Sequence, residues 1–221
     1  MSFEITNELL ANITSYIEAS NDKRIIALFE EMHYADVAEI LDELTFDDVI
    51  YIIKLIDSEK TSAVLMELDE DIREKILQKL SAKEIAEEVE ELDSDDAADI
   101  IGELSEERQE AVMSQIEDEE HVKEIEELLT YDEDSAGGLM AKELVKVNEN
   151  WSVLKCVREM RSQAGEVTRV HSIYVVDDDE KLKGRLSLKD LLITSTKTAI
   201  SEVYIPKVDF VNVHDNLDEV S

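Results

Sequence analysis

The sequence predicts a multidomain chain in which an all-α superhelical repeat domain, a solenoid, is followed by an α/β domain. Three observations predict this fold class. Apolar residues recur every twelve residues from Leu44 to Ile116, and a helix-capping residue follows most of them. The paired glycines Gly137 and Gly138 then interrupt the helical pattern. Beyond them, short β-branched runs alternate with helical segments, which is typical of an α/β domain.

The twelve-residue repeat predicts a two-turn helix and a short turn in each unit. Ser, Thr or Asp can accept hydrogen bonds from the free N–H groups that begin a helix, and acidic residues in the first turn suit the helix dipole. Because helices this short are marginal alone, they are expected to stack as a solenoid. Longer helices are expected at 7–19, 22–31 and 119–129. The apolar positions are Leu44, Ile56, Leu68, Leu80, Leu92, Leu104 and Ile116, and the capping residues are Thr45, Asp57, Asp69, Ser81, Asp93 and Ser105.

The second half of the chain is expected to fold from short strands and helices. One helix should begin after Asn150, which can cap it. Strands are predicted at 144–147, 172–177 and 184–188, and a short helix at 189–193.

A second copy of the α/β domain is expected near the end of the chain. The pattern Val145-x-Val147-x-x-Asn150 recurs 66 residues later as Val211-x-Val213-x-x-Asn216. The chain stops inside the first helix expected of that copy, so the copy is interpreted as truncated. The predicted boundaries are 1–131 for the helical domain, 132–198 for the first α/β domain and 199–221 for the start of the second.

The composition limits the classes of partner. A formal net charge of -34 opposes binding to nucleic acid or anionic lipid, and favours cations or basic proteins. Disorder is excluded because 43% of the residues are hydrophobic and recur at helical spacing. The single cysteine, Cys156, fits a reducing compartment. Neither a signal peptide nor an apolar run long enough to cross a bilayer is present, so this stretch is expected to be soluble and cytosolic.

The leading candidates for metal binding are four aspartates at the start of one predicted helix. Asp95 and Asp99 are spaced i, i+4 on one helical face, and Asp96 and Asp99 are spaced i, i+3. Carboxylate oxygens suit Mg²⁺, which keeps several waters and often needs only one or two protein ligands. The alternative is that Asp93 only caps the helix and that Asp95, Asp96 and Asp99 are solvated.

Other acidic clusters are weaker candidates. Asp132 and Asp134, with Glu133 between them, lie where the two predicted domains join, and a solvated linker is the alternative there. The aspartates at 177–179 are interpreted as a surface turn, and the acidic run 84–91 as a solvated helix face. Motifs for nucleophilic, phosphate-loop or paired acid–base catalysis do not appear, so the chain is not expected to be an enzyme.

The motifs of the chain resemble a known family. The run Ile173-Tyr-Val-Val-Asp177, followed by Gly184-x-x-Ser187-x-x-Asp190, resembles a CBS domain, which occurs in tandem. The twelve-residue helical repeat, the segment Asp-Asp-Ala-Ala-Asp-Ile-Ile and the junction Tyr-Asp-Glu-Asp-Ser-Ala-Gly-Gly-Leu-Met resemble the cytosolic part of MgtE-type magnesium channels. This resemblance covers the chain in order. The predicted fold is therefore an α-helical MgtE N-type repeat domain followed by an α/β CBS domain.

The resemblance implies a regulatory function. It implies a cytosolic Mg²⁺ sensor at the cytoplasmic face of the cell membrane, a homodimer through the CBS domains, and a transmembrane pore elsewhere in the full-length chain. Mg²⁺ that bridges acidic faces of the helical and CBS domains is expected to close the pore. Two alternatives stay open, an acidic helical scaffold for a basic protein partner and an adenine-nucleotide sensor.

The resemblance also implies a nucleotide site. Gly184, Ser187 and Asp190 match the motif with which many CBS pairs hold the ribose and phosphate of ATP or AMP. A structural turn and helix cap would use the same residues, and this alternative stays open as well.

Overall fold

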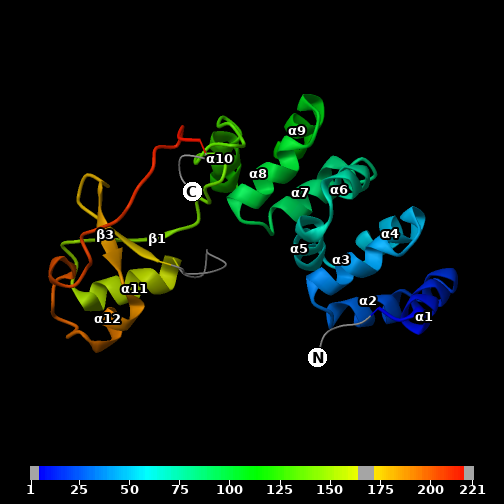
Figure 1. Ribbon diagram of the computed structural model, residues 1–221, viewed down its shortest axis with the longest axis horizontal. Helices are drawn as coiled ribbons and strands as arrows, with labels where there is room; N and C mark the ends of the chain where they lie inside the picture. The colour runs from blue at the N-terminus through cyan, green and yellow to red at the C-terminus, as the bar shows by residue number, and fades with distance from the viewer. Residues whose placement is uncertain (1–4, 164–171, 217–221) are drawn as a thin grey trace. The chain divides into compact units, whose positions relative to one another are not determined.

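The computed structural model describes residues 5–163 and 172–216, which divide into two compact units. The first unit comprises Met1–Leu92 and Asp96–Ile125, and the second comprises Asp93–Asp95 and Glu126–Ser221. Figure 1 shows helices throughout the first unit and a small sheet in the second. Among the described residues, no helix has both the length and the apolar character that a membrane crossing requires.

Between residues 5 and 128 the described chain is helical. Most of these helices are two to three turns long, as the repeat predicts. Their bounds are α1 Asn7–Glu18, α2 Asp22–Glu30, α3 Tyr34–Asp42, α4 Phe46–Ile53, α5 Ser58–Glu67, α6 Glu70–Leu77, α7 Ala82–Val89, α8 Ser94–Gly102, α9 Glu106–Met113 and α10 Glu119–Leu128.

The capping residues occupy the predicted positions, and the period begins earlier than predicted. Thr45, Asp57, Asp69, Ser81 and Ser105 are the N-caps of α4, α5, α6, α7 and α9. Twelve and twenty-four residues before Thr45, His33 caps α3 and Asn21 caps α2. The ring nitrogen Nδ1 of His33 accepts from the backbone N–H of Ala35 at 3.3 Å. The sequence did not predict α3, because histidine is not a usual capping residue.

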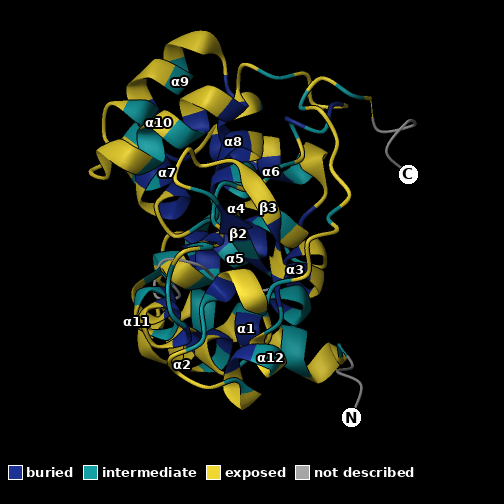
Figure 2. Cartoon of the chain, turned by 90° about the vertical axis from the view of Figure 1, so that its left-hand side faces the viewer, coloured by how far each residue is buried: buried dark blue, intermediate teal, exposed yellow. Residues whose placement is uncertain are grey.

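Helices of the first unit pack on partners two positions along the chain. α3 packs against α5, α5 against α7 and α7 against α9, while α1 packs against α2 and α4. Each two-turn helix therefore buries its apolar stripe against helices outside its own repeat, which is the arrangement of a solenoid. Each helix carries both buried and exposed residues, drawn dark blue and yellow in Figure 2. Fully buried members include Ile13, Phe29, Ile40, Ile52, Leu65, Ile76, Ile85 and Ile100.

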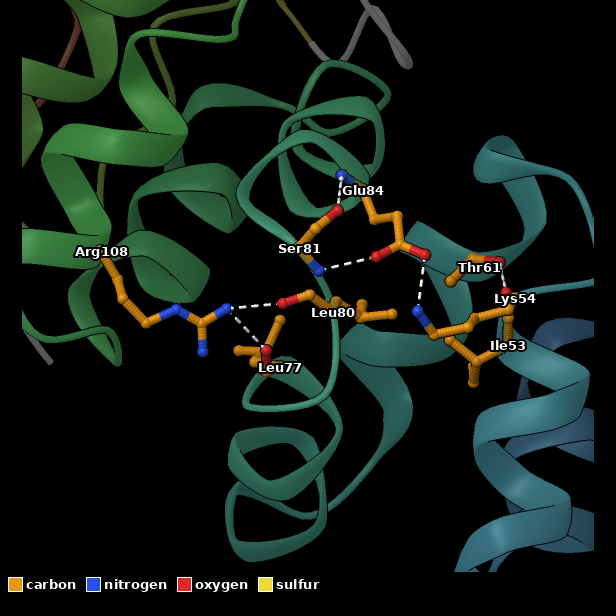
Figure 3. A network of polar contacts seen from close by, with 8 residues as sticks. All are labelled: Ile53, Lys54, Thr61, Leu77, Leu80, Ser81, Glu84 and Arg108. Carbon is orange, nitrogen blue, oxygen red and sulfur yellow. Dashed lines mark hydrogen bonds and ion pairs between the residues drawn. The ribbon is translucent and has the colours of Figure 1, made fainter.

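Polar contacts join repeats that are about 30 residues apart in sequence (Figure 3). Lys54 donates to Glu84 at 2.6 Å, and Glu84 also accepts from the backbone N–H of Ser81 at 2.6 Å in a capping box. The hydrogen bond from Lys54, followed by that from Ser81, lowers the pKa of Glu84 to about 2. The guanidinium of Arg108 donates to the carbonyls of Leu77 and Leu80 at 2.9 and 2.8 Å. A carbonyl at the end of α6 and one in the turn after it thus accept hydrogen bonds from a side chain of α9.

The second unit contains a three-stranded sheet with helices beside it. β1 pairs with β2 in parallel and β2 pairs with β3 antiparallel. The core contains Val145, Val147, Cys156, Val175 and Leu186, and Trp151 packs against it. β3 begins and ends two residues before the strand predicted at 184–188. It ends at Leu186 because the next residue, Ser187, caps the following helix. The bounds are β1 Val145–Asn148, α11 Val153–Gln163, β2 Ile173–Val176, β3 Leu182–Leu186, α12 Leu188–Ile193 and the 3₁₀ helix η1 Ile200–Glu202.

The segment after η1 does not repeat β1 within the described residues. Val211 and Val213, which sequence similarity aligns with Val145 and Val147, lie outside any strand. The carbonyl of Val213 instead accepts from the N–H of Gly137 at 2.8 Å, and that of Asp215 from Ala136 at 2.9 Å. The prediction that 199–221 begins a second CBS domain stays a prediction, and residues 217–221 lie outside the described part of the chain.

Candidate functional site

The four leading aspartates gather at the start of α8. Asp93 precedes the helix, while Asp95 and Asp96 lie in its first turn, and all three are half-buried. Asp99 is exposed one turn later. Burial lowers the pKa of the Arg73 guanidinium, but its hydrogen bond to Glu103 and the nearby negative charges, that of Asp99 among them, raise it above its usual value. The carboxylate of Asp99 therefore already interacts with a positively charged side chain of the protein, that of Arg73.

The carboxylate of Glu143, which the sequence did not single out, contacts Ser94, the first residue of α8. Glu143 accepts from both the backbone N–H and the hydroxyl of Ser94, at 2.8 and 2.9 Å. The hydroxyl of Ser94, which is fully buried, accepts in turn from the N–H of Lys142 at 3.0 Å. Glu143 therefore satisfies a free N–H at the helix start that a local cap would otherwise serve. Since the two residues are 49 positions apart, no local pattern could reveal this contact.

The junction turn presents its carboxylates to solvent. Asp132, Glu133 and Asp134 are all exposed, and Oδ1 of Asp132 accepts from the N–H of Asp134 at 3.1 Å. The buried hydroxyl of Ser135 donates to the carbonyl of Asp132 at 2.7 Å and accepts from Gly138 at 3.2 Å. These bonds hold the turn, so Asp132 has a structural task in addition to any ligand role.

The candidate carboxylates do not form a closed coordination cage. Within residues 5–163 and 172–216, none of the six aspartates predicted as ligands joins two other side chains in a set of converging donor atoms. Among the described residues these six aspartates are therefore not arranged to bind a metal ion through three or more side chains at once. A hydrated Mg²⁺ held by one or two carboxylates suits this arrangement, because Mg²⁺ dehydrates reluctantly.

A pocket of about 300 Å³ lies at the end of β3 in the second unit. Ser187 lines it, and the sequence predicted this residue. Arg185, near the end of β3, lines it as well. The sequence did not single out Arg185, because the motif includes only Gly184, Ser187 and Asp190. The full lining is Ser172, Ile173, Arg185, Leu186, Ser187, Leu188 and Ile205.

Gly184 and Asp190 are not among the residues that line this pocket. Gly184 faces Val175 on β2, and a Cβ on it would lie 2.2 Å from the carbonyl oxygen of Ile205 and 2.5 Å from the ring of Tyr204. The absence of a side chain at Gly184 therefore lets the segment of Tyr204 and Ile205 pass close to β3. Asp190 is half-buried on α12, outside the pocket wall.

Two acidic segments predicted to be solvated have different environments. Oδ1 of Asp177 accepts from the N–H groups of Asp179 and Lys181, both at 3.0 Å, and these hydrogen bonds lower its pKa. The surface turn at 177–179 is therefore confirmed. The prediction that 84–91 is a solvated helix face is wrong for Glu88, because this residue is only 8% exposed. Glu88 is three residues after Ile85, at the edge of the apolar stripe of α7, and this spacing could have signalled its burial.

Comparison with known proteins assigns a family to both parts of the chain. Residues 32–134 match the MgtE intracellular N domain, and residues 136–195 match the CBS domain. The magnesium transporter MgtE of Thermus thermophilus is 41% identical over 91 residues, which is 41% of this chain and 20% of the relative. That of Enterococcus faecalis is 30% identical over 93 residues, 42% of this chain and 20% of the relative. The matches thus span about a fifth of the length of these curated relatives.

Solved structures match over nearly the whole chain. A crystal structure of the cytosolic domain of the Mg²⁺ channel MgtE in complex with ATP has a TM-score of 0.87 and 30% identity, and the match covers 96% of this chain and 86% of that one. The soluble part of a magnesium transporter, 23% identical, shares the fold with a TM-score of 0.80, covering 96% of this chain and 84% of that one. The order of a helical domain and a CBS domain is the same as the sequence predicts. The chain therefore belongs to the MgtE family, and it corresponds to the cytosolic region of that family.

Proposed function

We propose that this chain is the cytosolic Mg²⁺-sensing regulatory region of a magnesium channel or transporter. The observation that carries the proposal is its likeness, over 96% of its length, to the cytosolic domain of the Mg²⁺ channel MgtE. In this proposal Mg²⁺ binds the carboxylates at the start of α8 and the junction turn, among them Asp95, Asp96, Asp132 and Asp134. Bound Mg²⁺ offsets the repulsion between the acidic units and favours a closed pore.

The charge of the chain supports a role for divalent cations. The chain carries a net charge of -34, and two like charges ~4 Å apart repel by about 1 kcal/mol in water. A divalent cation reverses the sign of that interaction. Sites with few protein ligands bind weakly, which suits a sensor of cytosolic Mg²⁺ in the millimolar range. We also infer that the region acts as a homodimer through its CBS unit, where Leu192 and Ile193 of α12 are 77% and 73% exposed.

Mg²⁺ is expected to stabilise the chain more than NaCl of equal ionic strength. For a site with a dissociation constant of about 1 mM, raising Mg²⁺ to ~10 mM adds about 1.4 kcal/mol to the free energy of unfolding. Thermal melting and protease resistance over a Mg²⁺ titration measure this gain. Replacing Asp95 and Asp96 together by alanine is expected to remove part of it.

The matched control is the double replacement of Glu106 and Glu107 by alanine. Both residues are exposed in the first turn of α9, so this variant loses the same charge at a different helix start. It is expected to keep the Mg²⁺ response. Equal effects of MgCl₂ and NaCl would contradict the sensor and favour the acidic scaffold for a basic protein partner.

The pocket beside β3 favours an adenine nucleotide as a second ligand. Its volume of about 300 Å³ lies at the lower end of the range for small-molecule sites, and its wall offers the guanidinium of Arg185 and the hydroxyl of Ser187. Ser187 makes no capping hydrogen bond with its side chain, so its hydroxyl can serve a ligand. A guanidinium suits phosphate, and a hydroxyl suits ribose. The similar cytosolic domain of MgtE is in complex with ATP.

Replacing Arg185 by alanine is expected to weaken ATP binding about tenfold, since one charge-assisted contact is lost. Isothermal titration calorimetry with ATP measures the affinity. Ser187→Ala is expected to weaken it as well, whereas Asp190→Ala, outside the pocket wall, is expected to have a smaller effect. If Asp190→Ala alone abolished binding, the nucleotide would lie on the predicted motif and not in this pocket.

A further inference from the structure

Glu88 on α7 is a buried carboxylic acid that none of the functions above uses. The residue is 8% exposed, and among the described residues its Oε2 atom finds no hydrogen-bond donor. A carboxylate in this position would carry an unpaired charge away from water, which is costly. A protonated carboxyl group has no net charge and avoids most of that cost.

Carboxylates near Glu88 also disfavour the ionised form of its side chain. Asp57 caps α5, which packs against α7, and Glu84, Glu87 and Glu91 belong to α7 and the turn after it. Burial first, and then these four negative charges, raise the pKa of Glu88 to about 8.

The cations near this cluster are engaged elsewhere. Lys54 pairs with Glu84 at 2.6 Å, and Lys83 pairs with Glu87 at 3.0 Å. On α9, which packs against α7 as well, Arg108 donates to the carbonyls of Leu77 and Leu80. None of these contacts neutralises Glu88.

We propose that Glu88 is a proton-binding site within the helical unit, and that loss of its proton weakens the packing of α7 against α5. The folded state holds this proton to a higher pH than the unfolded chain does. The stabilising contribution is therefore complete below pH 4.5, the usual pKa of the group, and is lost as pH rises toward 8. The stability of the solenoid then depends on pH across the neutral range.

The test compares the full 221-residue chain with Glu88→Gln, which has nearly the same shape and cannot ionise. Urea unfolding followed by helical circular dichroism, in Mg²⁺-free buffer, gives an unfolding constant at each pH. The ratio of the wild-type constant to that of Glu88→Gln is expected to rise about tenfold per pH unit between roughly pH 5 and pH 8, and then to level off. Taking this ratio cancels the titration of the other acidic residues.

Two further variants and one direct measurement keep the test decisive. Glu110→Gln removes an exposed carboxylate on α9 that is not among the charges acting on Glu88, and the ratio of the wild-type unfolding constant to that of this variant is expected not to change with pH. Glu88→Met should reproduce the profile of Glu88→Gln if charge, and not the amide, is responsible. Difference infrared spectra of the wild type between pH 6 and 9 should contain a protonated-carboxyl band that is absent from Glu88→Gln. A ratio independent of pH, or a band that survives the replacement, would overturn the proposal.

Discussion

Arg73→Ala is expected to lower the free energy of unfolding of the helical unit by about 3 kcal/mol, at the lower end for a broken buried ion pair. The side chain of Arg73 is 9% exposed and that of its partner Glu103 is 21% exposed. The Nε atom donates to Oε1 of Glu103 at 2.8 Å, and Nη2 contacts the same oxygen. Without the guanidinium, Glu103 keeps a charge in a poorly solvated position, where its Oε2 atom is already buried. Urea unfolding followed by helical circular dichroism measures the loss.

Two comparisons separate this buried pair from ordinary surface charge. The double replacement Arg73→Met with Glu103→Leu removes both charges and is expected to recover most of the lost stability, because apolar groups can fill the same space. Lys83→Ala breaks an exposed pair with Glu87, whose side chains are 74% and 52% exposed, and should leave the unfolding midpoint almost unchanged. If Arg73→Ala were as mild as Lys83→Ala, the pair would not hold α6 to the loop after α8.

Gly184→Ala is expected to destabilise the second unit by about 3 kcal/mol, at the upper end for overpacking. The added Cβ would lie 2.2 Å from the carbonyl oxygen of Ile205, a backbone atom that cannot move like a side-chain tip. That carbonyl accepts from the N–H of Arg185 at 3.0 Å, and the N–H of Ile205 donates back at 2.9 Å. Relief of the clash therefore disrupts both hydrogen bonds.

The fluorescence of Trp151 reports this loss selectively. Trp151 is the only tryptophan of the chain and packs against the core of the second unit. Its unfolding transition should shift in Gly184→Ala, while the helical circular dichroism of the first unit should shift little. Lys183→Ala, an exposed neighbour on β3, is the control and should leave both signals in place. An unchanged Trp151 transition would contradict the packing role of Gly184 and leave ligand contact as its explanation.

Much of the helical unit could be predicted because its signals are local. A capping residue and an apolar residue suffice to start each two-turn helix, and both recur every twelve residues. The prediction failed where the local signal was unusual. His33 and Asn21 continue the period toward the N-terminus, but α3 was missed because a histidine stands at its cap. The repeat at Val211 and Val213 predicts the start of a second α/β copy, and in the described residues the carbonyl of Val213 accepts from the N–H of Gly137, a contact that no local pattern could reveal.

The candidate sites were predicted less completely than the fold. Ser187 lies in the pocket as expected, but Arg185 was overlooked and Gly184 packs against Ile205. The aspartates of α8 could be found from their spacing. Their neighbour Glu143 could not, because it comes from 49 residues further along the chain.

By itself the sequence determined where most of the helices begin, which faces are apolar, and that the chain carries a large excess of negative charge. Only the tertiary structure decided how far each charged side chain is buried and which other charges lie near it. Glu87 and Glu88 are adjacent and chemically identical, yet one is exposed and pairs with Lys83 while the other is buried beside Asp57. The free energy of an ionised side chain depends on its distance from water and from other charges, and helices distant in sequence set both distances.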